Sequence, residues 1–112
     1  MAHTLYISNA FALSMLSRDG RIRSPYPIRD AAEALEYINN WEFHGAQIVS
    51  CIGHANTAAI LSKLLERDLS ANRTNIKLDD HSCILVGQYV GPRLPEGATE
   101  LPEGATIEWW II

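Results

Sequence analysis

Cysteine is scarce in this sequence, and neither cysteine lies in a pattern typical of a disulfide framework or a metal site. Cys51 and Cys83 occur in separate apolar runs without CxxC spacing. We expect both to be buried, reduced thiols. Histidine is also dispersed, because His3, His44 and His81 share no spacing such as HxxxH, which indicates surface or loop positions. The sequence therefore predicts no metal and no other cofactor.

Long apolar runs and an excess of positive charge are missing as well. No run approaches the ~18 apolar residues of a membrane span, and the N-terminus lacks the basic and apolar regions of a leader. We therefore expect a soluble, cytoplasmic protein that does not bind membranes. The 9 basic and 13 acidic residues give a formal charge of -4. This balance argues against a broad cationic surface for duplex nucleic acid, although it allows a local basic pocket.

One domain is expected, because 112 residues with 47% apolar content suffice for a single core over residues 1–112. Alternating or compact apolar runs predict strands at residues 3–8, 46–52, 83–90 and 106–112. Apolar residues at helical spacing predict one helix from residue 31 and another over residues 55–68. The expected fold class is α/β, a single-domain mixed β-sheet with helices packed on it.

Local signals refine this outline. Asp30 and Glu33 have the spacing of a capping box at the start of the first helix. Asn9 is available to cap a short helical turn over residues 9–16. Pro25 and Pro27 confine their segment to an edge strand or a loop.

The adjacent Trp109 and Trp110 must point to opposite faces of the last strand. One is expected to fill the core and the other to lie at a surface between subunits. A base-stacking platform is the less favoured use of either ring.

The segment "SCIGHANTAA" is the first candidate site. A glycine turn between a strand and a helix lets backbone N–H groups point at an anion. His54 lies at this turn, where an imidazole can protonate a leaving oxygen because its pKa is ordinarily near neutral. The alternative is that His54 or Asn56 only caps the helix.

A second candidate lies in "GPRLPEGATELPEGAT", in which the hexapeptide LPEGAT occurs twice. Arg93 and Glu96 can project from one stiff loop, and a guanidinium binds phosphate through two bonds while a carboxylate orients it. The alternative is an ordinary surface ion pair. The second copy has Glu100 where the first has Arg93, so we predict one working loop and one turn.

Four short motifs together resemble a known family in order and spacing: "SNAFALSML", "IGHANT", "ANR" ahead of a strand, and "RLPEG" after one. The family comprises small viral and bacterial proteins similar to the turreted icosahedral virus orphan protein, and includes the type III anti-CRISPR ring nucleases. The resemblance extends from Leu5 to Gly97. It implies a homodimer that binds a cyclic oligoadenylate, typically the tetramer, across its two-fold axis and cleaves it without metal.

The resemblance also implies roles for individual residues. His54 matches the histidine that protonates the departing 5′ oxygen, while Arg93 and Glu96 match the phosphate-binding arginine and an assisting acid. The expected ligand-binding set is Asn9, Asn56, Thr57, Arg73 and Ser14. In RNA the neighbouring 2′-OH is an internal nucleophile, so this chemistry needs only alignment, charge neutralisation and an acid.

The chain departs from viral members at Ala98, where they commonly carry Lys, and at Ser14, where they carry a second Asn. Two other functions are compatible with the residues. One is a protein that binds and sequesters a cyclic nucleotide without cutting it. The other is a structural or regulatory dimer with no nucleotide ligand.

Overall fold

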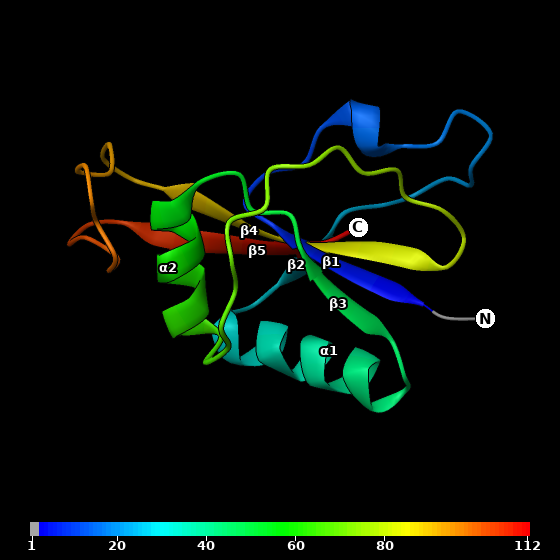
Figure 1. Cartoon of the computed structure of the whole chain (residues 1–112), viewed down its shortest axis with the longest axis horizontal. Coiled ribbons are helices and arrows are strands. Elements are labelled where there is room, and N and C mark those ends of the chain that lie inside the picture. Colours follow the sequence, from blue (N-terminus) through cyan, green and yellow to red (C-terminus); the bar gives the residue numbers. More distant parts are fainter. Residues whose placement is uncertain (1–2) are drawn as a thin grey trace.

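Five strands form one mixed sheet in the order β2-β5-β4-β1-β3 (Figure 1). The architecture is that of a computed structural model that describes residues 3–112; Met1 and Ala2, which the predicted domain includes, lie outside this range. The elements in chain order are β1 (Thr4–Ser8), η1 (Leu13–Met15), β2 (Tyr26–Ile28), α1 (Ala31–Phe43), β3 (Gln47–Ser50), α2 (Ala55–Leu64), β4 (Ser82–Val90) and β5 (Thr106–Ile111). The predicted α/β class with a mixed sheet is confirmed.

Strand direction divides the sheet into a parallel and an antiparallel part. β1 lies between β3 and β4 and pairs with both in parallel, with Ile7 opposite Ser50 on one side and Leu85 on the other. β5 runs antiparallel to β4 and to β2. Parallel strands end at a common edge of a sheet, so the chain that follows β1, β3 and β4 leaves from the same side.

The two faces of the sheet are covered differently. On one face, Leu5, Ile7 and Trp109 pack with residues of both helices, such as Ile38 and Leu61. Figure 1 shows α1 below the sheet, whereas η1 and long irregular segments lie above it. This second face carries η1 but no α-helix, and it is called the helix-free face below. Its buried residues form a smaller cluster: Cys51, Leu78, Ile84 and Val86. Trp110 is half-buried against that cluster, so the two tryptophans do point to opposite faces.

Several local predictions are confirmed. Asp30 is the N-cap of α1, and its Oδ1 accepts a hydrogen bond of 2.9 Å from the Glu33 N–H. Pro27 lies in β2, a short strand at the edge of the sheet. In the part of the chain described, no helix is both long and apolar enough to cross a membrane.

Other predictions are wrong in detail. Asn9 does not cap a helical turn, because the short 3-10 helix begins only at Leu13 and its N-cap Ala12 offers no side-chain acceptor. Cys83 is only half-buried, whereas Cys51 is 7% exposed; both are free thiols. Burial raises the pKa of the Cys51 thiol above its ordinary value, which makes the thiol less reactive.

Candidate functional site at the carboxyl edge of the parallel strands

The predicted site residues come from segments that follow the three parallel strands. Asn9 follows β1, His54 follows β3, and the loop of residues 91–105 follows β4. Ligands of open α/β sheets bind outside the carboxyl ends of such strands. β4 continues to Val90, four residues beyond Val86, the last β4 residue that pairs with β1. The loop of residues 91–105 therefore leaves the sheet farther along the strand direction than the segments that follow β1 and β3.

A side-chain hydrogen bond joins the first two segments. The Asn9 Oδ1 accepts from the Gly53 N–H at 3.1 Å, in a half-buried position. This bond fixes the turn that precedes α2 against the end of β1. Since the bond uses only the carbonyl oxygen of the Asn9 amide, its NH2 group is available to donate to a ligand.

His54 occupies the N-cap position of α2 with extended backbone angles, φ -134° and ψ 136°. Its carbonyl accepts the first helical bond, from the Ala58 N–H at 2.9 Å, but its side chain makes no capping bond. The Asn56 side chain also makes no hydrogen bond to another residue within 3–112. The capping alternative is therefore wrong for both side chains, and the exposed imidazole of His54 is free to act on a ligand.

The first turn of α2 supplies backbone donors beside His54. The N–H groups of Ala55, Asn56 and Thr57 have no acceptor within the helix, and they lie at the positive end of the helix dipole. Thr57 is only 6% exposed, so its side chain is directed away from solvent. Its predicted contribution to ligand binding can come from its backbone N–H.

Asn72 attaches a fourth segment to the same edge. Its N–H donates to the Ile52 carbonyl at 2.9 Å, and its Nδ2 donates to the Ser50 carbonyl at 3.0 Å. The exposed Arg73 follows directly, so it lies one residue from this anchor. The prediction that Arg73 lies near a strand start is wrong, because the chain is irregular until β4 begins at Ser82.

Ser14 lies elsewhere. It belongs to η1 and lines a separate hollow of about 400 Å³ together with Thr74, Asn75 and neighbouring residues. The backbone bond from the Leu78 N–H to the Met15 carbonyl, 2.8 Å long, holds the two walls of this hollow together.

Both LPEGAT copies form the same turn. In each copy the alanine N–H donates to the proline carbonyl three residues earlier, at 3.1 Å in both cases. The intervening glycine has positive φ, 78° at Gly97 and 80° at Gly104, as a type II turn requires. The first copy is therefore a turn as well. The two copies differ in the residue that comes before them, which is Arg93 for the first copy and Glu100 for the second.

Arg93 and Glu96 are exposed and make no ion pair with each other, or with His54, within residues 3–112. The surface ion-pair alternative is thus wrong for this pair. Glu100 instead pairs with Lys63 of α2 at 3.1 Å. This exposed ion pair joins the loop that carries Arg93 to the last turn of α2, at the end of the helix opposite the N-cap His54.

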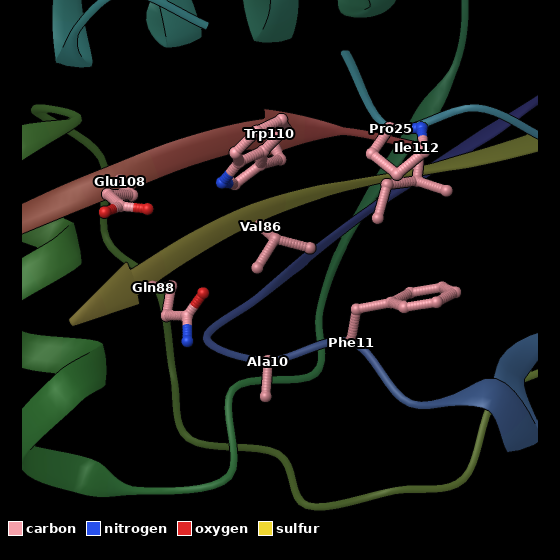
Figure 2. Close-up of a pocket in the computed structure, with 8 residues that line it drawn as sticks. All are labelled: Ala10, Phe11, Pro25, Val86, Gln88, Glu108, Trp110 and Ile112. Carbon is pink, nitrogen blue, oxygen red and sulfur yellow. The ribbon is translucent and has the colours of Figure 1, made fainter. Parts of the chain in front are cut away.

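A cavity of about 590 Å³ lies on the helix-free face next to this edge (Figure 2). Its lining residues are Ala10, Phe11, Pro25, Val86, Gln88, Glu108, Trp110 and Ile112. Gln88 and Glu108 escaped the sequence prediction. The available signal was the alternation along both strands, which places them on the same face as Val86 and Trp110. Nowhere in residues 3–112 do His, Cys, Asp or Glu side chains gather in threes that could hold a metal ion.

Fold and site define a small single-domain α/β protein with polar groups at the carboxyl edge of its parallel strands. The sequence profile of the STIV B116-like family matches residues 5–108, and the chain belongs to this family. B116 of Sulfolobus turreted icosahedral virus has a similar solved structure, with a TM-score of 0.77 and 20% sequence identity over 96% of this chain and 97% of that one. At this identity the likeness shows the fold alone. No curated protein matches the chain.

Proposed function

We propose that this protein is a metal-independent ring nuclease that binds and cleaves a cyclic oligoadenylate, with cyclic tetra-adenylate as the expected ligand. The observation that carries the proposal is the hydrogen bond from the Gly53 N–H to Asn9. It joins two of the motifs on which the resemblance to ring nucleases rests. Asn72, in a third motif, is bonded to the chain just before Gly53.

The side chains that the proposed reaction requires are all present in the chain. The 2′-OH of one nucleotide attacks the adjacent phosphorus, the bond to the 5′ oxygen breaks, and a 2′,3′-cyclic phosphate and a 5′-OH result. In this mechanism His54 gives its proton to the departing 5′ oxygen. Arg93 neutralises the phosphate, and Glu96, which makes no ion pair with Arg93 within residues 3–112, assists the nucleophile by accepting the proton of the 2′-OH.

The surroundings of His54 suit an anionic ligand. Free backbone N–H groups in the first turn of α2 can hold phosphate oxygens, and the helix dipole favours negative charge there. Because the imidazole makes no capping bond, it can turn toward the leaving oxygen. Arg73 adds positive charge on the neighbouring segment, so a local basic site is compatible with an acidic protein.

The proposal includes a homodimer. Leu13 and Ile22 are 80% and 98% exposed, and both lie on the segment between β1 and β2 that covers part of the helix-free face. A contact between two copies would remove this apolar surface from water. An isologous dimer also duplicates each ligand-contacting side chain, which suits a ring of repeated nucleotides.

Incubation with cyclic tri-, tetra- and hexa-adenylate in EDTA, followed by chromatography of the products, tests the proposal. We expect linear products from the preferred ring, with 2′,3′-cyclic phosphate ends. An unchanged ring that nevertheless raises the melting temperature would identify a sequestering protein instead. That alternative is favoured by one observation, the absence of any bond within residues 3–112 between His54 and either Arg93 or Glu96. Activity that chelation abolishes and a divalent ion restores would contradict the mechanism.

A further inference from the structure

We propose that Asn72 is a positioning residue that holds Arg73 beside His54, so that both side chains reach the same phosphodiester. The inference rests on the proposed function, because the phosphodiester would belong to the cyclic oligoadenylate. It goes further in assigning a role to Asn72 and in placing Arg73 relative to His54.

A short parallel pairing joins the segment before Arg73 to the end of β3. Ala71 and Ile52 form an isolated bridge in which the two chains run in the same direction. His54 and Arg73 each lie two residues beyond the paired residue of their own chain, so they occupy equivalent positions in the register of the bridge. Paired chains lie ~4.7 to 4.9 Å apart, and the long side chain of Arg73 can span a divergence over the next two residues.

Three hydrogen bonds hold this pairing in place. The Asn72 N–H donates to the Ile52 carbonyl at 2.9 Å, and the Asn72 Nδ2 donates to the Ser50 carbonyl at 3.0 Å. The Ser50 hydroxyl in turn donates to the Ser70 carbonyl at 2.6 Å. Asn72 is thus bonded through its backbone and through its side chain, and a substitution can remove the side-chain bond alone.

The turn that carries His54 is fixed from both sides of β3, which is an edge strand with β1 as its neighbour. On the side of β1, the Asn9 Oδ1 accepts from the Gly53 N–H at 3.1 Å. On the open side lies the bonded segment of residues 70–72. The backbone that precedes both functional side chains is therefore held before a ligand binds, which reduces the entropy lost on binding and preorganises the charge.

Arg73 has no partner within the described chain that would compete with a phosphate. It is exposed, and within residues 3–112 its guanidinium makes no hydrogen bond or ion pair. A guanidinium binds phosphate through two parallel bonds, so Arg73 retains its full capacity for a ligand. Other cationic side chains are engaged by carboxylates or backbone carbonyls, namely Arg23, Arg29, Lys63, Arg67 and Lys77.

Cross-linking without ligand tests the position of Arg73. In a chain that carries His54→Cys and Arg73→Cys, a short bifunctional thiol reagent should join the two new cysteines. Adding Asn72→Ala should lower the cross-linked fraction several-fold, and so should Asn72→Asp, which keeps the size of the side chain but removes the Nδ2 donor. No cross-link in the first chain would overturn the inference, as would a cross-linked fraction that both Asn72 variants leave unchanged.

Two controls accompany this experiment. Chains with either new cysteine alone correct for reaction of the two native cysteines. A chain with Lys63→Cys in place of His54→Cys should cross-link poorly to Arg73→Cys, because Lys63 lies in the last turn of α2, at the end opposite His54.

A double-mutant cycle on ring cleavage tests the link to the reaction. Asn72→Ala should lower the single-turnover rate by up to ~10²-fold, the loss that a misplacement of about 1 Å can cause. Because this loss acts through Arg73, Asn72→Ala should change the rate by less than about twofold when Arg73→Ala is already present. Asn39→Ala, at an exposed position of α1, is the matched control and should leave the rate unchanged. Independent effects of Asn72→Ala and Arg73→Ala would overturn the inference.

The two experiments separate this inference from the proposed function. A cross-link that depends on Asn72, in a chain whose parent cleaves no ring, would mean that the proposed reaction fails and the position of Arg73 stands. Ring cleavage by the parent, together with a cross-linked fraction that does not depend on Asn72, would mean the reverse.

Discussion

The side chain of Asn9 holds the backbone of Gly53, with 3.1 Å between Oδ1 and the amide nitrogen. These residues are far apart in the sequence, yet their contact determines where the turn before α2 lies relative to β1. His54 follows Gly53 directly, so the position of the proposed general acid depends on an amide at the end of another strand. Asn9 therefore has a structural role beside any role in ligand binding.

Replacing Asn9 tests this dual role. Asn9→Ala leaves the Gly53 N–H without its partner and should lower the free energy of unfolding by about 1 kcal/mol. Asn9→Asp retains an acceptor of the same size and should keep most of the stability. Its negative charge should nonetheless weaken binding of an anionic ligand. Chemical denaturation and ligand titration of both variants provide the measurements, and equal stability of Asn9→Ala and the parent chain would contradict the structural role.

The repeated hexapeptide allows an internal control. Arg93→Ala should weaken ligand binding and cleavage together, because it removes a charged partner of the phosphate. Glu103→Ala alters the same kind of turn in the second copy and should leave both nearly unchanged. Steady-state kinetics of the two variants make the comparison, and equal damage from both would show that the first copy has no special role.

The cap of α1 predicts a dependence of stability on pH. The Glu33 N–H, and then the neighbouring Arg29, hold the pKa of the Asp30 carboxyl below its ordinary value of 3.8. A lowered folded-state pKa contributes stability that is present above the ordinary value and is lost as pH falls through the lower one. Asp30→Ala should therefore lower the melting temperature near neutral pH by roughly 4 to 8 °C, the usual effect of a lost cap.

That difference should shrink in acid as the parent chain also loses its charged cap. Melting curves at a series of pH values provide the measurement. Asn39→Ala, on the exposed surface of the same helix, is the control; alanine favours the helix slightly, so its small difference from the parent chain should stay constant with pH. A constant difference between Asp30→Ala and the parent chain down to pH ~2 would contradict the assignment.

Association of two chains is a separate prediction. Light scattering at micromolar concentration should give the mass of a dimer. Ile22→Asp should shift the mass toward that of a monomer without unfolding the chain, because Ile22 is 98% exposed and lies outside the core. A monomer mass for the parent chain would remove the basis for a pocket across a two-fold axis.

Much of the fold follows from periodicity in the sequence. The alternation of Leu5 and Ile7 predicts a strand that ends near Ser8, which is where β1 ends, and the Asp30 cap predicts the start of α1. These features depend on near neighbours in the chain, which a sequence displays directly. The segment around Arg73 fails as a strand start because pairing with the sheet, and not local preference, decides where β4 begins.

The site is less predictable than the fold because its contacts join distant segments. His54, Arg93 and Asn9 can be nominated from their motifs, but nothing local shows that Asn9 bonds to Gly53 or that Glu100 bonds to Lys63. Gln88 has no motif of its own, and only the register of β4 against β5 brings it opposite Glu108. Such pairs depend on register, which local propensity does not determine.

The role of His54 is the central claim, and a single-turnover assay of His54→Ala paired with a melting curve tests it most directly. The substitution removes the proposed proton donor but leaves the backbone N–H donors of α2 and the side chains of Arg73 and Arg93. Ligand affinity should therefore change little. The rate should fall by ~10²- to 10⁴-fold, the usual contribution of a general acid. The melting temperature should stay near that of the parent chain, because the imidazole makes no capping bond. A near-normal rate at saturating ligand would contradict the account.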